Sequence, residues 1–249
     1  MEFLPGFGIA ALIGLLGVGG GVITAPVLTL FFGVPPAESV GTALIFTAVV
    51  KLTAGPIYLL RRQVNFRVLG LLVMGGLPGV LLGSFILARL HDAKRSGPVL
   101  AVLGITVVLT ALLNLYRLIR TRKETPSRER LRWLPWIGLP IGAEVGFSSA
   151  GAGALGSIIL MTMTRLTTAE VVGTDVLFGL VLSLAGGGIS LGLGNYHAAL
   201  VIKLSAGGIL GAFAGANLLS VLPSRPLRVA LSLWLVSLGG QLCWRALAG

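Results

Sequence analysis

The sequence predicts an all-α polytopic membrane protein, and its composition, its hydropathy and an internal repeat are the observations that predict it. Of 249 residues, 55% are hydrophobic and only 11% are charged, whereas soluble domains carry about 25% charged residues. Apolar runs of about 20 residues, the length that spans a bilayer, recur from end to end. We therefore expect residues 1–249 to form a single membrane domain.

Eight hydrophobic segments are expected to be helical. They cover residues 5–32, 37–60, 67–90, 97–119, 133–163, 168–194, 197–222 and 226–247. Pro36 and Pro98 suit helix starts, because proline is tolerated in a first turn. The sequence TTAE at 167–170 matches a capping box. The only long polar stretch, TRKETPSRER at 121–130, reads as a solvated linker.

The two halves of the chain resemble each other at one constant offset. AESVGT at 37–42 lies over AEVVGT at 169–174, and GGLPGVLLG at 75–83 lies over GGILGAFAG at 207–215. The same offset places Gly14, Gly19 and Gly21 over Gly146, Gly151 and Gly153. A shared offset over three separated motifs predicts an internal duplication. We expect repeat 1 over residues 5–119, a linker over 120–132 and repeat 2 over 133–247, giving two homologous four-segment repeats.

Each repeat begins with a glycine-rich interruption, GLLGVGGGVITAP at 14–26 and GFSSAGAGALG at 146–156. A helix broken inside a bilayer frees backbone groups that must face protein or a water-filled cavity. Paired interruptions in two halves of a transporter point to a substrate site, and N–H groups at a helix N-terminus suit an anion. Close helix packing is the alternative, and it is the interpretation we favour for GGLPGVLLG and GGILGAFAG.

The basic residues favour a topology in which segments 5–32 and 133–163 are re-entrant. Lys and Arg collect in cytoplasmic loops, and they separate more sharply between the two faces if both segments turn back at their glycines. Each repeat then has three full crossings, so the repeats would be inverted. Whether these segments cross or re-enter stays open, but linker 120–132 is cytoplasmic in both arrangements. Topology explains the net charge of +11 more simply than nucleic-acid binding does.

Ionisable residues inside apolar segments are functional candidates, because a charge within the bilayer is costly. Lys51 is a candidate for contact with substrate or a counter-ion, and Asp175 and Glu144 are candidates for carrying a coupling proton. A static Asp175–Lys51 pair or an interhelical hydrogen bond is the alternative. The predicted substrate-binding residues lie in and beside the glycine motifs: Gly17, Gly19, Gly20, Gly21, Thr24, Thr42, Lys51, Ser148, Ser149, Gly151, Gly153 and Thr174.

The sequence contains no catalytic or metal-binding motif. HExxH, CxxC, Walker and GxSxG patterns are absent, and the single cysteine, Cys243, cannot form an internal disulfide. We expect no metal, no cofactor and no enzymatic activity. An integral-membrane enzyme and a membrane scaffold or assembly protein are the alternatives to a transporter.

The chain resembles the TauE/SafE family of sulfite exporters. The resemblance rests on GLLGVGGGVITAPVLTLFFGVPPAESVGT at 14–42, on GGLPGVLLG and on the weaker second copy of both. It implies an inner-membrane carrier that exports sulfite, sulfonates or related organosulfur anions. It also implies a coupling ion, proton or sodium, and leaves room for a homo-oligomer in the lipid bilayer. Ile158 replaces Pro26 and Arg165 replaces Gly33 in the second copy, so the halves are not expected to contribute equally.

Overall fold

The computed structural model describes residues 21–92, 96–119, 130–150, 153–218 and 224–248, and every regular element among them is helical. The helices are α2 (Gly21–Phe31), α3 (Pro36–Leu60), α4 (Phe66–Asp92), α5 (Ser96–Ile119), η1 (Leu131–Trp133), α6 (Leu134–Ser148), α7 (Ala154–Met163), α8 (Thr168–Leu193), α9 (Ala198–Leu218) and α10 (Ser224–Ala248). The prediction of an all-α protein is confirmed.

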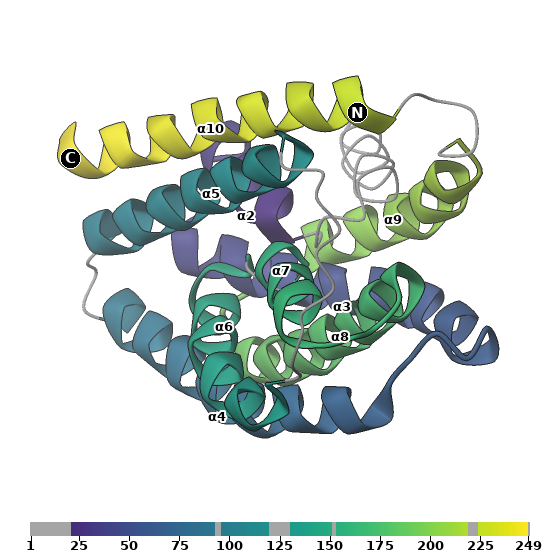
Figure 1. The fold of residues 1–249 in the computed structure, drawn as a ribbon. Coiled ribbons are helices and arrows are strands. Elements are labelled where there is room, and N and C mark those ends of the chain that lie inside the picture. Colours follow the sequence, from purple (N-terminus) through teal and green to yellow (C-terminus); the bar gives the residue numbers. More distant parts are fainter. Residues whose placement is uncertain (1–20, 93–95, 120–129, 151–152, 219–223, 249) are drawn as a thin grey trace.

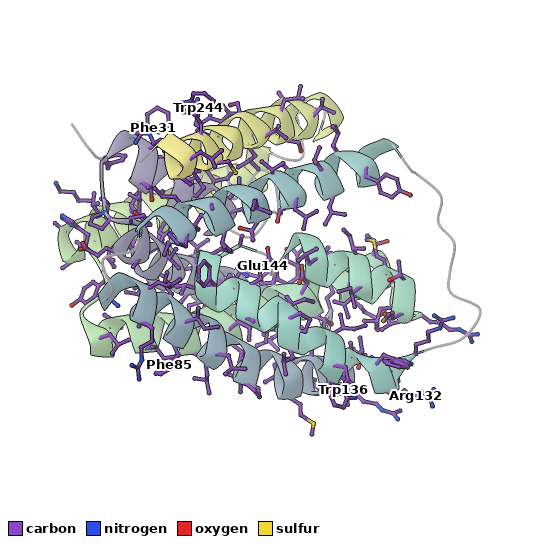
Figure 2. The ribbon with its side chains drawn as sticks, turned by 90° about the vertical axis from the view of Figure 1, so that its left-hand side faces the viewer. Phe31, Phe85, Arg132, Trp136, Glu144 and Trp244 are labelled. Atoms are coloured by element: carbon purple, nitrogen blue, oxygen red, sulfur yellow. The ribbon has the colours of Figure 1, made fainter. Side chains whose placement is uncertain are left out.

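Three of the described helices are long and apolar enough to cross a bilayer, over Pro36–Leu60, Phe66–Leu90 and Thr168–Leu193. Large apolar side chains on the outside of the molecule agree with this setting. Phe31, Phe85, Trp136 and Trp244 are all exposed, and Figure 2 shows them on the periphery of the helices. Such a surface suits contact with lipid better than contact with water.

Local sequence signals account for the ends of several helices. Pro36 occupies the first turn of α3. At the start of α8, Thr167 and Glu170 form the predicted capping box, in which the Glu170 carboxylate accepts from the Thr167 N–H over 2.8 Å. Gly194 ends α8 in the left-handed conformation at φ 71°, where a residue with a Cβ would be strained.

The helices pack in a few extensive pairs. α5 lies along α10, α3 lies against α8, and α4 is packed between α6 and α8. Figure 1 shows the α5–α10 pair along one edge of the molecule, with α4 and α8 on the opposite side and α6 and α7 between them. The interior is mostly apolar, and Phe46, Phe178 and Leu44 are among its fully buried side chains.

The segment predicted over 133–163 is broken into α6 and α7 and turns back on itself. α6 ends at Ser148 and α7 begins at Ala154, so the break falls within the predicted glycine-rich interruption. At the outer ends of the two helices, the Arg130 N–H donates to the Met163 carbonyl over 3.0 Å. The chain therefore leaves α7 beside the point where it entered η1 and α6.

Contacts between the halves occur in pairs related by the sequence offset. The Thr42 hydroxyl accepts from the His197 N–H over 2.9 Å, and the Thr174 hydroxyl accepts from the Asn65 N–H over 3.0 Å. Residues 42 and 65 correspond to residues 174 and 197 at that offset. Two further reciprocal pairs are Gly76 against Phe178 with Gly208 against Phe46, and Gly173 against Gln63 with Gly41 against Asn195.

Glycines bring α4 and α6 into backbone contact, which confirms the packing interpretation of GGLPGVLLG. A Cβ on Gly79 would overlap the Leu139 carbonyl, and a Cβ on Gly142 would overlap the Gly76 carbonyl. The glycines with such contacts are spaced by four residues on both helices, at Gly75, Gly79 and Gly83 on α4 and at Gly138, Gly142 and Gly146 on α6. Small residues at this spacing let helix backbones approach closely in a membrane. Gly146, assigned to the interruption from the sequence, belongs to this contact.

We expect Gly79→Val to destabilise the protein, because valine would force α4 and α6 apart. Overpacking a tight contact costs about 1–3 kcal/mol, and a lower yield and a lower thermal unfolding midpoint of the purified protein would measure the loss. Gly70→Val, on the same helix where a Cβ meets no neighbouring atom, is the matched control. Equal losses in the two variants would contradict the close contact at Gly79.

Candidate functional site

Gly21 and Ser149, from the two predicted glycine-rich interruptions, meet in the interior. A Cβ on Gly21, the first described residue of α2, would overlap the carbonyl and hydroxyl oxygens of Ser149, the residue that ends α6. Gly21 and Ser149 are both predicted site residues, and they come from different halves of the chain. The predicted site residues Gly17, Gly19, Gly20 and Gly151 lie outside the described residues.

The second break places opposite ends of two helix dipoles close together. Ser149 has φ 60° and Gly153 has φ 129°, and the latter value is readily reached only by glycine. Gly153 is the N-cap residue of α7, and because glycine has no side chain it does not occupy the N–H groups of the first turn. The N-terminus of α7 carries partial positive charge, and the C-terminus of α6 carries partial negative charge. The break therefore combines backbone donors and acceptors in a buried place.

The hydroxyl groups around this break differ in their hydrogen bonds. The Ser148 hydroxyl donates to the Glu144 carbonyl over 2.9 Å and accepts from the Ala150 N–H over 3.2 Å. The Ser149 hydroxyl is buried and has no hydrogen-bond partner among the described residues. Thr24 is fully buried in the first turns of α2 and makes a polar interaction of its own. Among these three serine and threonine residues, Ser149 has the hydroxyl best able to bind a ligand.

Asp175 lies on α8 against the first turn of α7. Its Oδ2 accepts a 2.6 Å hydrogen bond from the Ser157 hydroxyl, and a Cβ on Gly156 would overlap its Oδ1. Asp175 is 4% exposed and Lys51, on α3, is 8% exposed. The two side chains are close enough to interact electrostatically. The structure thus contains the interhelical hydrogen bond that was one alternative raised for Asp175, and the Asp175 carboxylate also attracts Lys51.

Glu144 lies one helical turn before the break. The residue is partly buried, and its Oε1 is buried with no hydrogen-bond partner among the described residues. Figure 2 places Glu144 near the middle of the molecule, between the α5–α10 pair and α4. A carboxyl oxygen without a partner is costly to bury, so Glu144 is an unusual residue for a purely structural position.

Thr42 and Thr174, both predicted site residues, make hydrogen bonds between the two halves of the chain. Each hydroxyl accepts from the backbone N–H of the residue preceding a helix in the other half, His197 before α9 and Asn65 before α4. These bonds hold both ends of the α3–α8 pair. Among the described residues, no group of three metal-ligating side chains comes together.

Sequence analysis missed Gly156 and Ser157 as neighbours of Asp175. Neither residue type is unusual in an apolar helix, so composition gave no signal. The repeat offset does provide one, because Gly156, Ser157 and Asp175 stand where the first half has Thr24, Ala25 and Ala43. A carboxylate, its hydroxyl donor and the space for it are thus present in the second half at positions where the first half lacks them.

Comparisons with known proteins agree on a membrane transporter. Residues 3–242 match the family model described as sulfite exporter TauE/SafE. The probable membrane transporter protein YjnA of Bacillus subtilis (strain 168) is 30% identical over 245 residues, covering 94% of this chain and 96% of YjnA. YdhB of the same organism, also a probable membrane transporter protein, is 28% identical over 91% of this chain and 93% of its own length.

A probable membrane transporter protein of Haemophilus influenzae (strain ATCC 51907 / DSM 11121 / KW20 / Rd) is 26% identical. That match covers 87% of this chain and 83% of the relative. No solved structure matches the chain.

We expect Thr42→Val and Thr174→Val to destabilise the protein by similar amounts. Valine keeps the shape of threonine but leaves a backbone N–H in the other half without its acceptor, at a cost of about 1–3 kcal/mol. Thermal unfolding of the purified variants measures the effect. The control is Thr162→Val, because the exposed Thr162 hydroxyl bonds only to carbonyls of its own helix. If the three variants unfold alike, the two hydrogen bonds contribute nothing to stability.

Proposed function

We propose that this chain, which belongs to the sulfite exporter TauE/SafE family, is a secondary transporter of small anions in the inner membrane. Its curated relatives are probable membrane transporters. We propose sulfite, a sulfonate or a related organosulfur anion as substrate, with export coupled to an ion gradient. Because the family is that of sulfite exporters, sulfite is the first compound to test.

The contact between Gly21 and Ser149 is the observation that carries the proposal. It brings the break of the second half against the predicted glycine-rich interruption of the first half, which supports a site of the kind that paired interrupted helices form around transporter substrates. An oxyanion at this place would accept from backbone N–H groups at the start of α7 and from the Ser149 hydroxyl. Charge-assisted hydrogen bonds of this kind are stronger than those between neutral groups.

The proposed mechanism uses two inverted repeats. The hydrogen bond between Arg130 and Met163 supports a re-entrant α6–α7 hairpin, which leaves three full crossings in the second repeat. The reciprocal bonds of Thr42 and Thr174 support a two-fold relation between the repeats. Inverted repeats can rock about a central site and expose it to one side of the membrane at a time. This topology keeps linker 120–132 in the cytoplasm.

The buried ionisable residues have two roles in the proposed mechanism, attraction of the substrate and transfer of the coupling proton. Lys51 attracts an anionic substrate, and Asp175 balances the Lys51 charge when the site is empty, since the two interact. Glu144 has a buried oxygen without a hydrogen-bond partner among the described residues, and no side-chain hydrogen bond holds it in place there, so we assign it the coupling proton. Asp175 is already held by Ser157, which suits a fixed charge better than one that gains and loses a proton in each cycle.

Two alternatives predict different outcomes. An integral-membrane enzyme would change the compound chemically, whereas a transporter would move it unchanged. A membrane scaffold would tolerate substitutions beside the breaks without loss of flux. Because the curated relatives are described as transporters, we place transport first.

The decisive test is uptake of labelled sulfite or a labelled sulfonate into liposomes containing the purified protein. We expect flux of the unchanged compound above that of empty liposomes. Ser149→Gly should raise the KM about tenfold or more, because a hydrogen bond to a charged group contributes about 1.5–3 kcal/mol. The same variant should fold at least as well as the parent, since glycine suits the φ of 60° at this position.

Ser190→Ala is the control, because the Ser190 hydroxyl donates to the Gly186 carbonyl of its own helix. Chemical conversion of the compound without net flux would rule out the transporter. Flux with an unchanged KM in Ser149→Gly would move the substrate site away from the break while leaving the transport function intact.

We expect Glu144→Gln to abolish the stimulation of flux by a pH gradient while leaving exchange of substrate for substrate. Glutamine keeps the size of the side chain but cannot release a proton. Flux in the variant, measured with and without an imposed gradient, tests this. In Asp175→Asn, the pH gradient should still stimulate flux, but the maximal rate should fall, because asparagine leaves the Lys51 charge without its counter-charge. The opposite pattern would assign the coupling proton to Asp175.

A further inference from the structure

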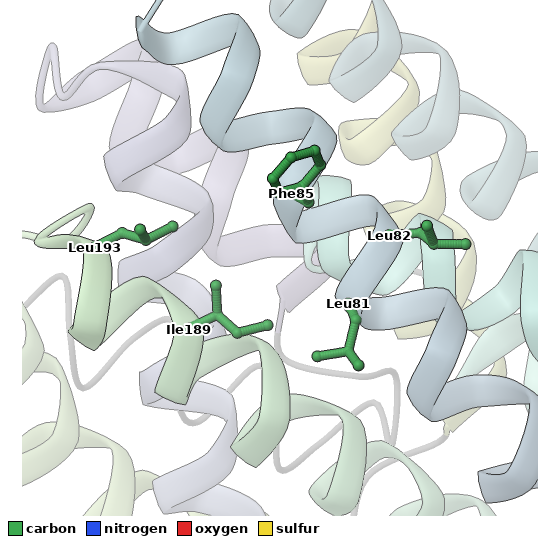
Figure 3. Close-up of a pocket in the computed structure, with 5 residues that line it drawn as sticks. All are labelled: Leu81, Leu82, Phe85, Ile189 and Leu193. Atoms are coloured by element: carbon green, nitrogen blue, oxygen red, sulfur yellow. The ribbon is translucent and has the colours of Figure 1, made fainter.

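A groove on the membrane-facing surface runs between the C-terminal halves of α4 and α8. Its lining is entirely apolar and consists of Leu81, Leu82, Phe85, Ile189 and Leu193, around a volume of about 440 Å³. Figure 3 shows Leu81 and Ile189 pointing into the groove from the two helices. The groove lies near the C-terminal ends of both helices. Leu193 is the last residue of α8, and Phe85 is seven residues before the end of α4.

The lining residues of α4 form a stripe that continues to an arginine. Leu81, Phe85 and Arg89 are spaced by four residues, so they share one face of the helix, and each step is about 6 Å along its axis. α4 and α8 run in the same direction, since Gly76 packs on Phe178 and Val80 packs on Gly186. Arg89 therefore lies beyond the groove in the direction of the membrane surface.

Arg89 is held at this end of the groove. Its guanidinium carbon lies 4.9 Å from the centroid of the Phe85 ring, within the range of a cation–π contact. Stacking uses the face of the guanidinium and leaves the N–H groups at its edge, which bind phosphate well. An apolar groove that ends at a positioned arginine is complementary to a molecule with an apolar tail and an anionic head.

We propose that this groove binds one acidic phospholipid, with an acyl chain between α4 and α8 and its phosphate on Arg89. The proposal does not depend on the transport function proposed above. The bilayer supplies this ligand at high concentration, and a lipid keeps its head group at the interface, where Arg89 requires it. A second copy of the chain fits less well, because a stable protein interface takes about 20–30 residues a side and would bury Arg89 without an anion.

Native mass spectrometry of the detergent-purified protein can test the proposal with phosphatidylglycerol and phosphatidylcholine of identical acyl chains. We expect one phosphatidylglycerol per chain, bound about fivefold more tightly than phosphatidylcholine, as one arginine near an anionic head group contributes about 1 kcal/mol. Arg89→Gln should remove this preference. Ile189→Trp, or Leu193→Trp if the first variant folds poorly, should fill the groove and weaken binding of both lipids.

The matched control is Arg132→Gln. Arg132 also lies over an aromatic ring, 5.7 Å from the centroid of Trp133, but neither residue lines this groove, so its loss should leave the lipid preference unchanged. Equal binding of the two lipids to the parent protein, or equal effects of Arg89→Gln and Arg132→Gln, would overturn the proposal. Displacement of the lipid by glycerol phosphate alone would also overturn the proposal, because the acyl chain would then contribute nothing. Dissociation of a dimer by Ile189→Trp without loss of lipid would overturn it too, because the groove would then bind a second copy of the chain.

Discussion

The backbone contact between α4 and α6 is the interaction on which the rest of the structure depends. Lipid tails are as apolar as leucine, so no hydrophobic driving force brings two helices together in a bilayer. Close van der Waals contact takes its place, and glycines at Gly79 and Gly142 allow it because they let each backbone reach the carbonyls of the other helix. α4 also contacts α8 through Gly76 and Phe178, so one helix positions both the broken segment and a core helix of the second half.

This contact determines where the break of the second half lies. α6 follows α4 until Ser148, and the left-handed Ser149 then rests against Gly21 of the first half. The return helix α7 brings Ser157 to Asp175 on α8. The described part of the candidate site is thus built on helices packed against one another, and Ser149 and Gly153 have positive φ angles at the break.

The two halves make reciprocal contacts at corresponding positions but differ in chemistry at others. The hydroxyls of Thr42 and Thr174 make equivalent bonds to the opposite half. At the start of α7, however, Gly156, Ser157 and Asp175 replace the Thr24, Ala25 and Ala43 of the first half. Gly156 leaves the space that the Asp175 carboxylate occupies. The second half therefore contributes a buried negative charge, and the corresponding position in the first half is neutral, as the different roles proposed for the halves require.

The sequence by itself determined the helical class, most helix limits, the capping box at Thr167 and an interruption within 146–156, because these depend on hydropathy, proline, glycine and capping within a few residues. It also identified Lys51 and Asp175 as buried charges. Only the tertiary structure decided that Gly21 meets Ser149, that Ser157 donates to Asp175, and which helix packs against the glycines of α4. The reason is physical. A membrane helix is apolar on all sides, so its sequence does not mark which face is buried against protein, and these contacts join residues that only the packing of whole helices brings together.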